Sequence, residues 1–137
     1  MSIRNLRLKM DTYGISRAAY EELRAFCLQY DEKRNRLSEV SFLGGVSYES
    51  TPVSHGISQP TENLAERLAR LNADVEMIYD AAHEAAPGWE AFVVQSVTRN
   101  IPFWKLKLDK NLTIGDNSFH AMRRKFFYVL AKKRGMI

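Results

Sequence analysis

Ten Lys and Arg residues fall within the last 39 positions of this chain, and their chemistry is that of a surface that binds polyanions. Only Asp109 and Asp116 oppose them, so residues 99–137 carry a net charge of +8, whereas residues 1–98 are net −4. A mildly acidic body joined to a strongly basic end is the asymmetry expected of a protein that binds nucleic-acid phosphate. An ordinary solvated face can also be basic, but here the charges coincide with a helical motif.

The stretch SFHAMRRKFFYVLAKKRG at 118–135 predicts a final helix with two different sides. At about 100° per residue, five large apolar residues share the side expected to pack on a core: Phe119, Met122, Phe126, Val129 and Leu130. The other side is polar and basic, as a recognition helix in a DNA groove needs. The residues expected to contact DNA, two upstream lysines included, are Asn117, Ser118, His120, Ala121, Arg123, Arg124, Lys125, Tyr128, Lys132, Lys105 and Lys107.

The residue types in this set indicate different roles. Arg124 is best placed for a bidentate contact with guanine, and Asn117 and His120 for other base edges. Arg123 lies at the border of the two sides by angle and is expected to meet phosphate together with the lysines. The helix dipole favours cations at a C-terminus, which alone would explain residues 132–134. It does not explain the cations in the middle of the helix.

Three helices joined by tight turns predict a trihelical helix-turn-helix domain at 87–137. The dipeptide Pro87-Gly88 ends the preceding helix, and the last of the three helices is the long basic one. Its apolar side is expected to close a small core against four upstream residues: Trp89, Phe92, Trp104 and Leu106.

The first 86 residues predict an N-terminal arm at 1–15 and a long helical hairpin at 16–86. Ser16 is a suitable N-cap for the first helix, and apolar residues continue at helical spacing as far as Leu37. A long loop at 38–60, rich in Ser, Gly and Pro, separates the two helices of the hairpin. No stretch alternates apolar and polar residues long enough to predict a strand, so the expected fold class is all-α.

The second helix of the hairpin carries an apolar seam at alternating steps of four and three residues. The seam runs through Leu64, Leu68, Leu71, Val75, Ile78, Ala82 and Ala85. Such a stripe packs against another helix. The favoured partner is the first helix of the same hairpin. The alternative is a homodimer in which the seam of a second copy packs through Leu64, Leu68, Leu71, Val75 and Ile78.

The sequence lacks the residues needed for a disulfide, a metal site, a catalytic site or a membrane span. The single Cys27 cannot form an internal disulfide, and no Cys/His cluster predicts a metal site. His55, His83 and His120 have no partner motif for catalysis, and no glycine-rich phosphate loop is present, so neither an enzyme nor a cofactor is expected. No run approaches the roughly 18 apolar residues of a membrane span, and no secretory signal opens the chain. We therefore expect a cytoplasmic protein without a membrane partner.

Three segments together resemble a family of small phage and prophage proteins of Firmicutes, grouped with phage transcriptional regulators of the ArpU and RinA type. The segments are YGISRAAYEELRAFCLQYDEKRNRL, PGWEAFVVQSVT and FHAMRRKFFYVLAKKRG. The C-terminal third is also similar to the promoter-reading helix-turn-helix of sigma factors. The resemblance implies a phage-encoded, sequence-specific transcriptional regulator. Its partners would be double-stranded DNA and, through the hairpin, another subunit or RNA polymerase.

Two further functions fit the same pattern. A phage assembly or DNA-packaging component, such as a small terminase subunit, would also join a helix-turn-helix to a helical hairpin, with the seam building a ring. A helical protein-interaction module without nucleic acid would use the same cations to meet an acidic partner.

Overall fold

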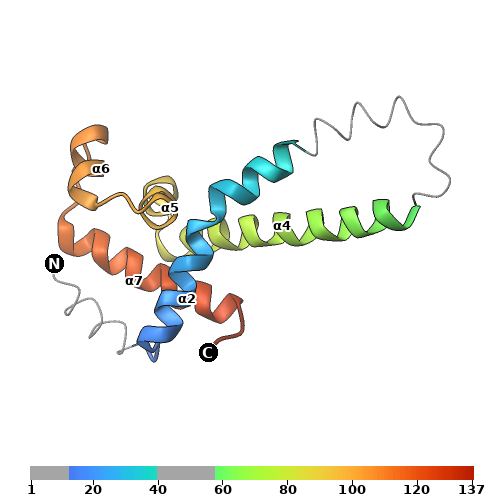
Figure 1. Cartoon of the computed structure of the whole chain (residues 1–137). Coiled ribbons are helices and arrows are strands. Elements are labelled where there is room, and N and C mark those ends of the chain that lie inside the picture. The colour runs from blue at the N-terminus through green and yellow to red at the C-terminus, as the bar shows by residue number, and fades with distance from the viewer. Residues whose placement is uncertain (1–12, 40–57) are drawn as a thin grey trace. The chain divides into compact units, whose positions relative to one another are not determined.

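The computed structural model describes residues 13–39 and 58–137, and all regular structure within these ranges is helical (Figure 1). The predicted all-α fold class is confirmed. The elements are α2 (Arg17–Leu28), a further helix at 30–39, α4 (Ser58–Ala85), α5 (Glu90–Arg99), α6 (Phe103–Lys110) and α7 (Asp116–Lys133). Within the described ranges, none of these helices is both long and apolar enough to cross a membrane.

Two of the predicted segments fall largely outside the described residues. These are the N-terminal arm at 1–15, up to residue 12, and the loop at 38–60, from 40 to 57 with His55 in it. The start of the first helix is as predicted, because the Ser16 Oγ accepts a hydrogen bond from the Ala19 backbone N–H at 3.1 Å. The helix ends earlier than predicted, at Leu28 with Gln29 as its C-cap, and a separate helix follows at 30–39.

The chain divides into two compact units whose boundaries differ from the predicted ones. The first unit joins the residues up to Gln29 with residues 77–137, and the second consists of residues 30–76. The predicted division fell between residues 86 and 87. The difference arises because α2 packs with α5 and α7. The α2 helix therefore belongs with the C-terminal helices, and α4 contributes residues to both units.

Two side-chain contacts tie α2 to the C-terminal helices. The ring of Tyr20 meets that of Phe127 edge-on, with the centroids 5.1 Å apart. The guanidinium of Arg24 donates a hydrogen bond to the Asn100 side-chain oxygen at 3.0 Å. Asn100 ends α5 with a left-handed backbone (φ 54), a conformation that Asn adopts more readily than most residues.

Phenylalanines of α7 form much of the core of the first unit. Phe119, Phe126 and Phe127 are almost completely buried, and Phe119 stacks on Phe103 of α6 with the ring centroids 4.3 Å apart. The prediction that Trp104 packs in this core is wrong, because its side chain is 66% exposed. On the eight-residue α6, Phe103 and Leu106 form the buried side instead.

The apolar seam of α4 is helical as predicted, but its burial changes along its length. Ile78, Ala82 and Ala85 belong to the first unit and are buried, whereas Leu64 in the second unit is 37% exposed. Within the second unit, Lys33 of the helix at 30–39 forms an ion pair with Asp74 of α4 at 3.0 Å. The C-terminal part of the predicted first helix, at 30–39, therefore meets α4 in the second unit, and part of the seam stays open.

The junction between α4 and α5 offers a test of pH dependence. The His83 Nδ1 lies 2.6 Å from the Glu90 carboxylate, and this hydrogen bond, together with the backbone N–H of Glu90, holds the pKa of Glu90 below its ordinary value. A lowered carboxyl pKa contributes stability that is present above the unfolded-state pKa and is lost as the pH falls through the folded-state pKa. We expect His83→Ala to raise the Glu90 pKa towards its ordinary value.

The measurement is an NMR titration of the Glu90 side-chain carboxyl carbon from pH 7 down to pH 2. His83→Gln, which keeps a neutral donor at this position, serves as the control and should raise the pKa less. An unchanged Glu90 pKa in His83→Ala would show that the backbone alone sets it.

Candidate nucleic-acid interface

The exposed side of α7 gathers most of the residues expected to contact DNA. Asn117, Ser118, Ala121, Lys125 and Lys132 are exposed. At about 100° per residue they occupy one broad arc. The buried residues of the same helix occupy the opposite arc: Phe119, Phe126, Phe127, Leu130 and Ala131. The helix can therefore anchor in the core while it presents polar and cationic groups to solvent.

His120 and Arg124 lie at the edge of this exposed arc and are half-buried. Burial lowers the pKa of the His120 imidazole, and the charge of Arg123 acts in the same direction. The lowered pKa favours the neutral imidazole, in which one nitrogen donates and the other accepts. The Arg124 Nη1 is buried and makes no hydrogen bond, so only the exposed part of this guanidinium is open to an incoming acceptor.

Tyr128 lies further along the same side of α7 and is held by neighbours of the first unit. Its ring contacts the ring of Tyr13 with the centroids 5.0 Å apart, and the Lys132 ammonium lies 5.2 Å from its centroid. The tyrosine is half-buried by these contacts. Its position next to an exposed lysine suits a contact with phosphate or sugar.

The structure places Arg123 away from the exposed side, which differs from its expected role with phosphate. Its guanidinium lies 5.8 Å from the centroid of the Phe127 ring and next to Tyr20 of α2. Burial lowers the pKa of Arg123, while the Tyr20 side chain partly offsets this effect. Arg123 thus belongs to the packing of α2 on α7 and not to the interface.

The α6 helix lies next to the start of α7 (Figure 1), and its sequence carries Lys105 and Lys107. Lys105 and Lys107 are both exposed, and the Lys107 ammonium approaches the Asp116 carboxylate at 3.9 Å. The stacked rings of Phe103 and Phe119 fix α6 against the start of α7. Lys107 therefore lies beside the polar first turn of α7, whereas Lys105, two residues earlier, projects from another side of α6.

Two large apolar side chains on α6 were not predicted to be part of this surface. Trp104 is 66% exposed and Leu108 is 75% exposed. They are four residues apart, so they lie on one side of the helix. The spacing was visible in the sequence, since Phe103 and Leu106 lie on a different side by angle. An aromatic and an aliphatic side chain next to Lys105 can contact sugar or thymine methyl groups.

The terminal cations are largely neutralised by the protein itself. The Lys133 ammonium pairs with Glu84 at 3.3 Å, and the Arg134 guanidinium approaches Glu22 at 3.6 Å. The Arg134 guanidinium also lies 4.3 Å from the centroid of the Phe26 ring. Of the predicted cluster at 132–134, Lys132 alone is exposed without such a carboxylate among the described residues.

The described parts of the chain, 13–39 and 58–137, contain no group of three His, Cys, Asp or Glu side chains that could hold a metal ion. Comparisons of the chain with protein-family models, with curated proteins and with solved structures find no match.

Proposed function

We propose that this protein is a transcriptional regulator that binds double-stranded DNA with sequence preference, with α7 as its recognition helix. The observation that carries the proposal is a set of exposed cations on α6 and α7 without carboxylate partners. Lys105, Lys125 and Lys132 are exposed, and no carboxylate of the described residues pairs with them. Solvated cations of this kind bind phosphate by releasing counterions.

The first turns of α7 supply the groups that would read bases. Asn117 and Ser118 are exposed and Ala121 is small, so the helix can approach a base edge closely at this end. Arg124 stands one turn further on, with an unsatisfied Nη1. A bidentate pair between this guanidinium and guanine would discriminate against other bases, and it requires the Arg124 side chain to turn outward so that its Nη1 is exposed.

The arrangement of α5, α6 and α7 supports the same function. A three-residue connection joins α5 to α6, and a five-residue connection containing Gly115 joins α6 to α7. In helix-turn-helix proteins the last of these helices enters the major groove while the preceding helix crosses the backbone. The lysines of α6 then meet phosphate on either side of the groove that α7 reads.

Selection of bound fragments from a random duplex pool, at physiological salt, tests the proposal. The protein is expected to enrich a consensus sequence, and Arg124→Ala is expected to weaken binding to the selected site by about 1–3 kcal/mol. Arg124→Lys is the matched control, because it keeps the charge and loses the bidentate geometry. It should lose discrimination between bases while its binding to unrelated DNA is unchanged.

Two results of the selection would contradict the proposal. If the protein enriches no sequence, it does not read bases. If Arg124→Ala and Arg124→Lys bind the selected site as tightly as the original protein, α7 is not the recognition helix.

A further inference from the structure

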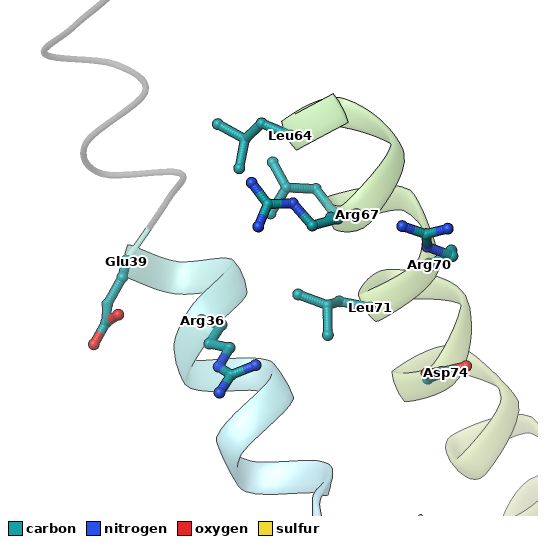
Figure 2. Close-up of a pocket in the computed structure, with 8 residues that line it drawn as sticks. Arg36, Glu39, Leu64, Arg67, Arg70, Leu71 and Asp74 are labelled. Atoms are coloured by element: carbon teal, nitrogen blue, oxygen red, sulfur yellow. The ribbon is translucent and has the colours of Figure 1, made fainter. Parts of the chain in front are cut away.

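The second unit contains an open groove between the helix at 30–39 and the first half of α4. Its volume is about 510 Å³, and its lining comes from both helices: Arg36, Glu39, Leu64, Arg67, Leu68, Arg70, Leu71 and Asp74. Figure 2 shows Leu64, Arg67 and Leu71 extending from α4 towards the helix that carries Arg36. This groove lies in a different unit from the basic surface of α6 and α7.

The floor of the groove is apolar and has the spacing of a helix seam. Leu64, Leu68 and Leu71 stand at steps of four and three residues. Leu64 is exposed, and the helix at 30–39 covers only part of the stripe. An amphipathic helix laid into such a groove would bury its own apolar residues at the matching steps.

The rim of the groove has more unpaired positive than negative charge, because two arginines stand against Glu39, whose side chain Figure 2 shows directed away from α4. Asp74 forms an ion pair with Lys33 at 3.0 Å, and Arg36 forms one with Glu32 at 3.0 Å. Arg67 and Arg70 pair with no carboxylate among the described residues. An occupant with carboxylates beside its apolar stripe would complement these two guanidinium groups.

The charges also weigh against a second copy of this chain as the occupant. Two grooves that meet face to face would bring Arg67 and Arg70 of both copies into one interface, and like charges in an interface cost free energy. An acidic helix avoids this cost and gains charge-assisted hydrogen bonds from the arginines. We propose that the groove binds an amphipathic helix of another protein, with Asp or Glu flanking its apolar stripe.

Two labelled synthetic helical peptides test this inference. Both carry Leu at alternating steps of four and three residues, and they differ only in flanking positions, which are all Glu in one and all Lys in the other. We expect the full-length protein to bind the Glu peptide at least tenfold more tightly than the Lys peptide, measured by fluorescence anisotropy. The pair of variants Arg67→Glu and Arg70→Glu, combined in one chain, should reverse this preference.

The controls separate the groove from net charge and from folding. Arg17→Glu combined with Lys110→Glu makes the same change of net charge on exposed residues outside the groove and should leave the preference intact. Leu68→Asp should abolish binding of both peptides. Circular dichroism of each variant reports whether its helices are retained, and the comparison of the two peptides on the unaltered protein needs no variant.

Three outcomes would overturn the inference. The first is equal binding of the two peptides, and the second is binding of neither. The third is a stable dimer of the protein at micromolar concentration that Leu68→Asp dissociates, because the groove would then belong to a second copy. None of these results bears on the basic surface of α7, so the proposal of DNA binding would stand or fall separately.

Discussion

Replacing Lys105, Lys125 and Lys132 together by Gln is expected to weaken binding to duplex DNA by about 100-fold at 0.15 M salt. Each lysine that neutralises a phosphate releases condensed counterions, which contributes about fivefold in affinity at this salt concentration. The plot of log affinity against log salt should become shallower by about 2.7, or about 0.9 for each phosphate that is no longer neutralised. The loss of affinity and the slope are both measured by fluorescence anisotropy titrations of a labelled duplex. The salt concentration runs from about 50 to about 300 mM, which spans the physiological ionic strength.

A control triple variant separates this surface from the overall charge of the chain. Arg17, Arg67 and Arg70 are exposed and lie outside α6 and α7, so their replacement by Gln removes the same net charge. Only a small loss of affinity is expected from this variant, because in the proposed complex these arginines neutralise no phosphate. If the two triple variants lose affinity and salt dependence equally, the cations of α6 and α7 form no specific interface.

The lysines are expected to determine the affinity for any DNA sequence, and Arg124 is expected to determine the additional affinity for the selected site. Removing a lysine that meets phosphate weakens binding to every sequence by a similar factor, whereas removing a residue that reads a base weakens binding to the selected site alone. A combined variant should therefore show the two effects added on the selected site. The cations of α7 would then divide into a positioning set and one reading residue, in keeping with their different exposure.

Local patterns in the sequence predicted the parts of the fold that depend on local geometry. Ser16 was recognisable as an N-cap because its side chain meets a backbone N–H three residues away. The seam from Leu64 to Ala85 was recognisable because its steps match the helix period. The separation of Phe119 and Phe126 from Lys125 on α7 followed from the same period. None of these inferences required knowledge of which helices meet.

The end of α2 and the surroundings of Arg123 depend on tertiary packing, which the sequence pattern does not reveal. No Gly or Pro marks the end of α2 at Leu28, so the break before the helix at 30–39 had no sequence signal. The placement of α2 against α5 and α7 then removed Arg123 from the exposed side of α7. Its spacing of four residues from Phe119 and three from Phe126 already placed Arg123 near the apolar side of α7, and Tyr20 of the neighbouring helix covers it there.

The sequence predicted that this surface would be basic and exposed. It did not predict which of its side chains form ion pairs or how exposed each one is. The charge of the surface was visible from composition, and the exposed positions of α7 followed from periodicity. The ion pairs of Lys133 and Arg134 could not be predicted, because their partners Glu84 and Glu22 are distant from them in sequence. The same applies to Trp104, whose exposure depends on how much of a short helix its neighbours cover.

Phe119→Ala is expected to lower the free energy of unfolding by about 3–5 kcal/mol, the usual cost of truncating a fully buried aromatic residue. Phe119 is completely buried and stacks on Phe103, so the change removes the contact that fixes α6 against the start of α7. Because a small domain is stable by only about 5–15 kcal/mol, this single change is expected to remove much of the stability of the first unit. Urea unfolding followed by circular dichroism measures the loss.

The exposed Trp104 supplies the matched control, since it is an aromatic residue of α6 that lies next to Phe103. Trp104→Ala should change the free energy of unfolding by no more than about 0.5 kcal/mol, as is usual for surface positions. Phe119→Leu keeps most of the buried volume and should fall between the two. Equal destabilisation by Phe119→Ala and Trp104→Ala would mean that α6 does not pack through Phe103, and the surface that joins its lysines to α7 would then lose its structural basis.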